Sequence, residues 1–217
     1  AIAGPRVIEH MVDAVLQCEG EKHYAYRILR GIKNRFGSTN EIGIFEMGQN
    51  GLTEVSNPSK LFLAERLKNA PGTVVTASVE GSRSLLVEVQ ALTAVSVFGY
   101  PQRRVSGFDL NRLQLIVAVL QKKAFLNLLN QDVFINIVGG IKIKEPAIDL
   151  AVALAIASSF KNKPLDCHLC VFGELGLSGE IREVSFLSKR QSEAKRLSFT
   201  KFIQAKTIQE AVRSYLV

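Results

Sequence analysis

The segment from Glu145 to Ser159 constrains the fold most, because it combines a helical start signal with an unusually small and apolar interior. Pro146 is suited to the first turn of a helix, where its missing backbone N–H costs nothing. Ala151, Leu154 and Ala155 lie inside the segment. So many small side chains permit close packing against a sheet. The chain is therefore expected to place this helix on a sheet built from its other segments.

The segments around this helix predict an α+β domain over residues 58–217. Strands are predicted by runs rich in β-branched or buried residues, and helices by apolar residues at helical spacing. Asp109 is a candidate N-cap, and Thr207 with Glu210 forms a candidate capping box. The predicted strands are Thr73–Glu80, Ser84–Val97, Val133–Val138 and Leu169–Phe172, with a hairpin ending near Arg182, and the predicted helices cover 109–129, 145–159, 185–197 and 208–216.

Residues 1–57 have a different character. Alternating patterns over residues 6–55 predict three or four strands, and Gln49-Asn50-Gly51 is a strong hairpin signal. Ser56-Asn57-Pro58 then marks a break and the start of a short helix through Leu67. A few strands without a covering layer make a poor domain. We therefore interpret residues 1–57 as the end of a larger domain.

Composition narrows the class of protein. No apolar run reaches the ~18 residues of a membrane span, and no signal-peptide pattern opens the chain, so we expect a cytoplasmic protein without a membrane partner. Three poorly spaced cysteines fit a reducing compartment. Cys167 and Cys170 have zinc-knuckle spacing, but Cys18 is the only other cysteine and lies in the other predicted domain. Because a structural zinc site needs four ligands, no metal is expected.

Basic charge is concentrated in the second part of the chain. The net charge is +7, yet residues 1–57 hold six Lys/Arg against seven Asp/Glu, so the excess lies in residues 58–217. A basic excess in one segment suggests a polyanion such as nucleic acid. A scattered, solvated surface explains the charge equally well, so charge alone does not decide.

Two motifs bear on chemistry. A nucleotide-hydrolysis site would need a glycine-rich loop ending in Lys-Ser/Thr, and the sequence contains none, so no cofactor is expected. Lys33-Asn34-Arg35-Phe36-Gly37 places two cations on one face of an extended segment, where they could converge on a phosphate. An ordinary solvated strand edge is the alternative.

The motif Lys33-Asn34-Arg35-Phe36-Gly37 resembles the signature of the bacterial RadA/Sms family, and neighbouring blocks match that family as well. In residues 58–217 the similarity is to its version of the Lon proteolytic domain. The matching blocks include Gly4-Pro5-Arg6, Glu9–Asp13, Asn40–Gly43, Phe45–Met47, Glu80–Arg83, Val87–Leu92, Arg103–Gly107, Gly139-Gly140, Glu145–Ala147, Asp149–Ala151 and Gly173–Arg182.

The resemblance implies a Lon proteolytic-domain-like (ribosomal protein S5 domain 2-like) fold, preceded by the last β-strands of a RecA-like α/β ATPase core. It implies a hexameric ring that drives branch migration in recombinational repair, with ATP and Mg in the parent protein. The implied partners are single-stranded or branched DNA, further copies of the chain, and the RecA recombinase. In that family the five-residue signature couples nucleotide and DNA binding, a role that would fall to Lys33 and Arg35.

The same resemblance argues against peptidase activity. Ala147 stands where active Lon enzymes carry the nucleophilic serine, and Ser188 stands where they carry the lysine base. Ser158 and Ser159 lie about eleven residues further along, roughly 16 Å away in a helix. Lys189 would point ~100° away from the base position. No catalytic residue is therefore expected, and the alternative function as a Lon-like peptidase is disfavoured.

The basic residues at loops and element ends are the candidate DNA contacts, since a scaffold presents binding groups there. They are Arg83, Arg103, Arg104, Arg112, Lys142 and Arg182, and Lys144 lies in the same loop as Lys142. Arg103 and Arg104 are expected in a polar loop, and Arg112 could instead cap its own helix with Asp109. Few exposed aromatic residues are expected, which favours contacts to the DNA backbone. The remaining alternative is an assembly scaffold whose charges serve subunit contacts.

Overall fold

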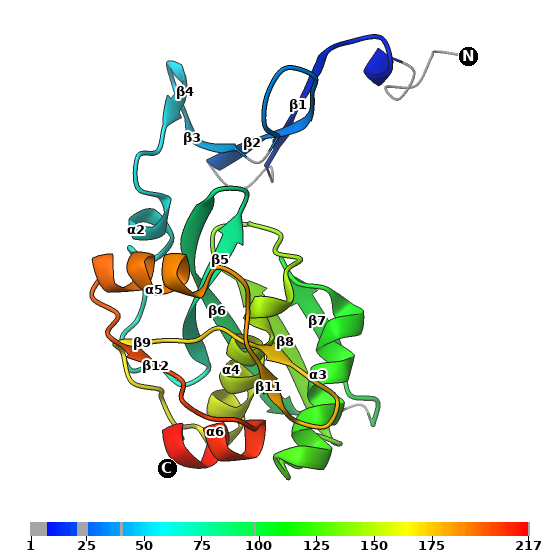
Figure 1. The fold of residues 1–217 in the computed structure, drawn as a ribbon. Coiled ribbons are helices and arrows are strands. Elements are labelled where there is room, and N and C mark those ends of the chain that lie inside the picture. Colours follow the sequence, from blue (N-terminus) through cyan, green and yellow to red (C-terminus); the bar gives the residue numbers. More distant parts are fainter. Residues whose placement is uncertain (1–7, 21–25, 40, 98, 217) are drawn as a thin grey trace.

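The computed structural model describes residues 8–20, 26–39, 41–97 and 99–216, which fold into a mixed α/β structure with two main sheets (Figure 1). The smaller sheet is antiparallel and has the order β1-β2-β3-β4. Its strands are β1 (Ala14–Glu19), β2 (Tyr26–Asn34), β3 (Ile42–Gly48) and β4 (Gly51–Glu54). The predicted hairpin is confirmed, because Gly48 pairs with Gly51 across Gln49-Asn50 and Gly51 has a positive φ of 103°. The block Gly4-Pro5-Arg6 lies outside the described residues.

The larger sheet is mixed and has the order β12-β9-β5-β6-β8-β7. The antiparallel pairs are β5–β6 and β6–β8, whereas β7 runs parallel to β8 and β9 runs parallel to β5. A short antiparallel hairpin, β10–β11, stands apart. The strands are β5 (Thr73–Glu80), β6 (Arg83–Val95), β7 (Arg103–Ser106), β8 (Gln131–Ile137), β9 (Leu169–Cys170), β10 (Glu174–Leu175), β11 (Ile181–Arg182) and β12 (Lys201–Phe202).

Helices cover both faces of part of this sheet (Figure 1). The main hydrophobic core lies between one face and α3, α4 and α6, and a smaller core forms on the other face around Leu86, Ala194 and Phe199. The helical elements are α2 (Pro58–Phe62), α3 (Leu110–Lys123), η1 (Pro146–Ile148), α4 (Asp149–Lys161), α5 (Leu187–Arg196) and α6 (Ile208–Tyr215). None of the described helices is long and apolar enough to cross a membrane.

The helix predicted at 145–159 is confirmed as η1 followed by α4, and it occupies the centre of the core. Every residue from Leu150 to Ser158 is fully buried. Asp109 and Thr207 act as N-caps as predicted, accepting hydrogen bonds from the amides of Arg112 and Glu210. The helix after Asn57 is shorter than predicted and ends at Phe62 rather than Leu67. Beyond it the chain turns, as the hydrogen bond from the Ala64 amide to the Leu61 carbonyl shows.

Ser59 of α2 closes a free edge of β6. Strand β8 pairs only with residues 89–95 of β6, which leaves the amide of Leu86 without a strand partner on that side. The Ser59 hydroxyl accepts from the Leu86 amide at 3.0 Å and donates to Glu193 at 2.6 Å. Since Ser59 is fully buried, this bond is not replaced by water.

Replacing Ser59 with alanine is expected to lower the free energy of unfolding by about 1–3 kcal/mol, because it leaves a buried amide unsatisfied. Urea denaturation measures the change. The matched control is Ser192→Ala, an exposed serine on α5, which should leave the stability nearly unchanged. Equal stability of the two variants would show that the Ser59 hydroxyl does not hold this edge.

Candidate functional site

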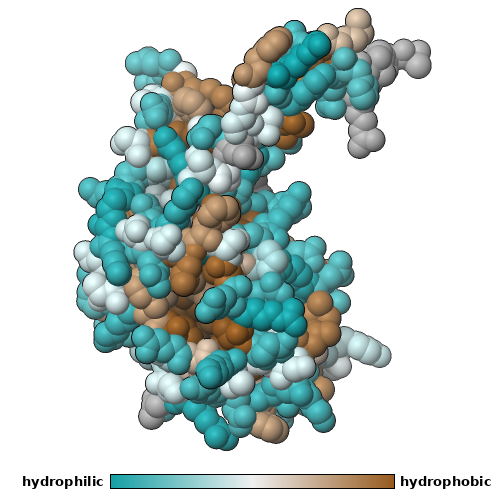
Figure 2. Space-filling model, in the orientation of Figure 1, coloured by the Kyte–Doolittle hydropathy of each residue, from teal (hydrophilic) through white to brown (hydrophobic). Residues whose placement is uncertain are grey.

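A cleft of about 380 Å³ lies between α3, the start of α4 and the β10–β11 hairpin. Its apolar wall includes Leu115, Ile116, Val119 and Leu175, and its polar side includes Arg112, Asp149 and Arg182. Figure 2 shows apolar surface gathered in the middle of the same face, with hydrophilic residues around it. The cleft brings together Arg112 and Arg182, two candidate DNA contacts that are 70 residues apart in the sequence.

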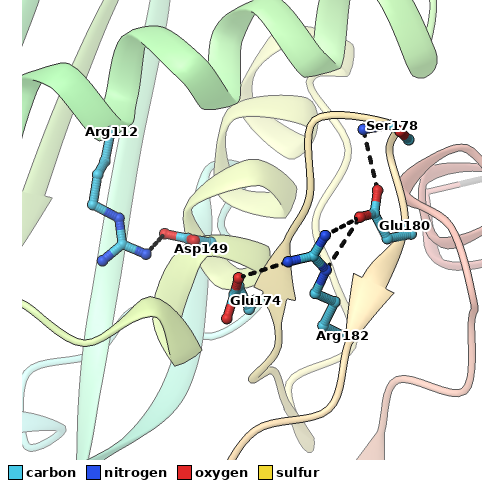
Figure 3. Close-up of polar contacts among 6 residues, drawn as sticks. All are labelled: Arg112, Asp149, Glu174, Ser178, Glu180 and Arg182. Carbon is cyan, nitrogen blue, oxygen red and sulfur yellow. Dashed lines mark hydrogen bonds and ion pairs between the residues drawn. The ribbon is translucent and has the colours of Figure 1, made fainter.

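Arg112 is engaged inside the protein. Its Nη2 lies 2.5 Å from Oδ1 of Asp149 (Figure 3). Its Nη1 donates to the backbone carbonyl of Lys144 at 2.9 Å. The guanidinium also lies 5.8 Å from the centre of the Phe108 ring. Arg112 thus ties α3 to α4 and to the loop before α4. Its partner is Asp149 rather than the side chain of Asp109, which accepts from the Arg112 backbone amide.

Asp149 is a carboxylate in an apolar setting, with only 5% of its surface exposed. Burial raises its pKa to about 6, against an ordinary value of 3.8. The Arg112 guanidinium and the backbone amide of Leu175 hold the pKa down, and the negative charge of Glu174 pushes it up. Burial wins because two hydrogen-bond donors do not fully replace the lost water.

The raised pKa of Asp149 predicts a specific pH dependence of stability. The folded state holds a proton on Asp149 at a pH where the unfolded chain does not, so the carboxyl favours folding below its ordinary pKa, and this contribution is lost as the pH rises through about 6. We expect the unfolding free energy of the wild type, relative to Asp149→Asn, to rise by about 1–2 kcal/mol from pH 7.5 to pH 5. Urea unfolding at several pH values measures this difference. A constant difference would contradict the burial argument.

Arg182 lies at the other side of the cleft and is also paired. Its Nη2 is 2.6 Å from Glu180 Oε1, its Nη1 is 3.5 Å from Glu174 Oε1, and Glu180 in turn accepts from the Ser178 amide (Figure 3). The side chain of Arg182 is 58% exposed, so this pair is in contact with solvent. Exposed pairs of this kind exchange partners at little cost. Arg182 can therefore turn to an anion more easily than Arg112 can.

Arg103 and Arg104 lie in a strand, so the expectation of a polar loop is wrong. They form part of β7, which adds to the sheet edge parallel to β8. The Arg103 guanidinium donates to the carbonyls of Gln102, Leu128 and Gln131, and burial lowers the pKa of Arg103. Arg104, the next residue of the strand, points to the opposite face and is exposed.

Arg83 and Lys142 are both exposed. Lys142 lies in a loop as expected, whereas Arg83 is the first residue of β6, directly after the turn at Gly81-Ser82. Lys142 and Lys144 line a groove of about 770 Å³ beside the small sheet. The carboxylates of that groove are occupied, because Glu19 and Glu80 pair with Arg30 and Glu145 pairs with Arg190. Across the described residues, no carboxylate pairs with Arg83, Arg104, Lys142 or Lys144.

The Lys33–Gly37 motif is only partly extended, which corrects the expectation of one continuous strand face. Strand β2 ends at Asn34, whose side-chain oxygen accepts from the Phe36 amide at 3.2 Å and so holds a turn. Lys33 donates to the Glu9 carbonyl at 2.8 Å, and Arg35 pairs with Asp13 at 3.3 Å. The two cations therefore contact different groups on the segment before β1. Phe36 is 83% exposed at the tip of the turn.

The two positions expected to replace a peptidase pair differ in environment. Ala147 is buried in η1, and Ser188 is exposed on α5. Ser158 accepts from the Gly72 amide and donates to the Lys163 carbonyl, while Ser159 accepts from the Thr93 amide. Lys189 lies over the ring of Phe186 at 5.3 Å. The hydroxyls of both serines therefore hold α4 to the sheet and to its own C-terminal end.

The sequence did not point to the most buried charged side chain among the described residues. Arg190 is 1% exposed and binds both oxygens of Glu145, at 2.9 and 2.6 Å, as well as the carbonyls of Ala77 and Ser185. Glu145 also accepts from the Val79 amide at 2.7 Å. Nothing in the local pattern of α5 separates Arg190 from the exposed Lys189 beside it. Among the described residues, no group of His, Cys, Asp and Glu could hold a metal ion.

Comparison with known proteins identifies the family. Residues 87–208 match the family model described as ChlI, subunit ChlI of Mg-chelatase. The chain is 56% identical over 199 residues to the DNA repair protein RadA of Listeria monocytogenes, 57% over 200 residues to that of Streptococcus pneumoniae, and 54% over 203 residues to that of Bacillus subtilis. Over residues 87–208 the chain belongs to the family described as ChlI, and nearly its whole length is homologous to part of the RadA proteins.

The RadA matches cover nearly all of this chain but less than half of each relative. They span 92–94% of the chain and 44–48% of the three relatives named above. The family expected from the Lys33–Gly37 motif and the later blocks is thereby confirmed. Of the predicted α+β fold class only the coarse part is confirmed, namely helices packed on a mixed sheet.

Proposed function

We propose that this chain is the DNA-contacting and ring-forming part of a RadA-type, ATP-driven DNA repair motor. In this proposal residues 1–57 are the last strands of a RecA-like core, and residues 58–217 form a Lon-like domain without peptidase activity. The observation that carries the proposal is the match of nearly the whole chain to proteins named as DNA repair proteins at 53–57% identity. The parent protein would use ATP and Mg, act in recombination and branch migration, and work in the cytoplasm beside the RecA recombinase.

The DNA contact is assigned first to the exposed cations without a carboxylate partner. Among the candidate contacts, Arg83, Arg104 and Lys142 meet this condition in the described part of the chain. Arg83 is the first residue of β6, Arg104 lies on the edge strand β7, and Lys142 lies in the loop before η1. Arg103 and Arg112 are assigned a smaller direct contribution to DNA binding, since their guanidiniums already bind carbonyls or a carboxylate. Arg182 is assigned an intermediate contribution to DNA binding, because its ion pair with Glu180 is exposed to solvent. Cations of this kind bind phosphates with little dependence on base sequence.

The test is fluorescence anisotropy with labelled single-stranded, duplex and forked DNA. The variant Arg83→Ala/Arg104→Ala/Lys142→Ala should bind about 10–100-fold more weakly, at roughly 1 kcal/mol or less for each lost phosphate contact. The control Lys122→Ala/Lys163→Ala/Arg213→Ala removes the same charge from three other exposed positions. If both variants bind DNA with the same affinity, the three assigned cations are not the DNA contact, and the affinity depends only on the net charge of the chain.

A scaffold without DNA contact is the competing function, and hexamer formation is common to both. Sedimentation velocity on the chain measures the ring directly. If the chain forms hexamers and binds no DNA at low salt, the scaffold function replaces the proposed one. A fluorogenic-peptide assay tests the third possibility, and no cleavage is expected, because the buried Ala147 offers only a methyl group.

A further inference from the structure

A separate cavity of about 280 Å³ lies where the turn after α2 meets the C-terminal end of α5. The charged residues that line it are all cations, namely Lys60, Arg66 and Lys68. Leu63, Leu197 and Phe199 form its apolar part. None of the candidate DNA contacts lines this cavity, so it is independent of the function proposed above.

Arg66 is fixed in place without a carboxylate partner. Its Nη1 donates to the Cys167 carbonyl at 3.0 Å, and its guanidinium lies 5.4 Å from the centre of the Phe199 ring. Its Nε is buried and has no hydrogen-bond partner among the described residues. No ion pair of Arg66 occurs in that part of the chain either. A half-buried guanidinium in this state favours a nearby anion.

Two ordinary explanations for these cations do not account for them. Cations often neutralise the free carbonyls at the end of a helix. At the end of α5, however, the Ala194 carbonyl accepts from Leu197 and Phe199, and the Lys195 carbonyl accepts from Ser198. The positive charge of Arg66 lowers the pKa of Glu88, but burial raises that pKa by more, so it lies above the ordinary value. Glu88 is therefore a poor counter-ion for Arg66.

We infer that this cavity binds a phosphate group, held by the Arg66 guanidinium with Lys60 and Lys68 at its rim. A planar guanidinium presents paired donors that match phosphate oxygens, and two lysines add charge that can move with the ligand. The Phe199 ring and the Cys167 carbonyl orient the guanidinium before the ligand arrives, which lowers the entropy cost of binding. The ligand is either a small phosphate compound or a phosphate of a nucleic-acid backbone.

Amide NMR of the chain titrated with inorganic phosphate tests the inference, with chloride as the reference at equal ionic strength. The expected result is a saturable shift of the resonances of residues 63–68 and 197–199. In Lys60→Ala/Lys68→Ala the affinity should fall at least fivefold. The control Lys122→Ala/Arg213→Ala removes the same charge from α3 and α6 and should change the affinity less than twofold. Arg66→Lys keeps the positive charge but loses the paired N–H donors of the guanidinium. This variant should bind phosphate more weakly without unfolding.

The two sources of phosphate are separated by a labelled oligonucleotide. If Lys60→Ala/Lys68→Ala weakens oligonucleotide binding and inorganic phosphate competes, the cavity takes a backbone phosphate. If oligonucleotide binding is unchanged while the phosphate shifts are lost, the cavity takes a small phosphate compound. The inference is overturned if phosphate causes no saturable shift at these residues, or if the Lys60/Lys68 variant and its control respond alike. Each result is independent of Arg83, Arg104 and Lys142, so the DNA proposal can fail while this one holds.

Discussion

Arg190→Met is expected to lower the free energy of unfolding by about 3–5 kcal/mol, because it leaves the carboxylate of Glu145 half-buried without its cation. Arg190 joins α5 to the segment before η1 through Glu145 and to β5 through Ala77, and it also holds the start of α5 through Ser185. Urea denaturation followed by circular dichroism measures the loss. Arg196→Ala removes an exposed cation from a pair with Glu193 on the same helix, and Glu193 keeps its hydrogen bond from Ser59, so the cost should be less than about 1 kcal/mol.

A double variant separates the unpaired charge from the lost packing. Arg190→Met/Glu145→Leu removes both charges, and it should recover part of the stability lost in Arg190→Met. Full recovery is not expected, since the Val79 amide also loses its acceptor. The unfolding free energy lost in the double variant is compared with the sum of the losses in Arg190→Met and Glu145→Leu. If the double variant loses more than that sum, the pair does not act through its buried charge.

Leu154→Ala is expected to cost about 3–5 kcal/mol, because it opens a cavity in the centre of the main core. Leu154 is fully buried on α4, whose small neighbours already pack closely and leave little freedom to collapse around the gap. The matched control is Leu115→Ala on α3, where the side chain is 53% exposed and the loss should stay within about 0.5 kcal/mol. Thermal and urea unfolding give both values. A loss for Leu154→Ala as small as that of its control would contradict the central place of α4.

Local sequence was sufficient for most elements of the fold. Pro146 and the small residues of α4 predicted the central helix, Asp109 and Thr207 predicted helix starts, and Asn50-Gly51 predicted the hairpin. These signals act over a few residues, so no distant contact is needed to interpret them. Strand β7 was missed for the opposite reason. Its sequence, Arg103-Arg104-Val105-Ser106, is polar, and only its pairing with β8 makes it a strand.

The ion-pair partners of the charged residues could not be predicted from the sequence. Arg112 meets Asp149, 37 residues away, and Arg190 meets Glu145, 45 residues away. Whether a cation is free or paired depends on which loops the fold brings together. A pattern of basic residues therefore gives the candidates for DNA contact, while the structure divides them into paired and unpaired groups. The turn at Arg35 is different, because it depends on a local bond between the side chain of Asn34 and the amide of Phe36.

The most direct test of the proposed function is the affinity of the wild-type chain for labelled DNA across a salt series. If exposed cations bind backbone phosphates, the logarithm of the association constant should fall linearly with the logarithm of salt concentration, with a slope of about −1 per contact, and binding should depend little on base sequence. A hexameric chain that binds no DNA at low salt, or binds with an affinity independent of salt, would contradict the proposal.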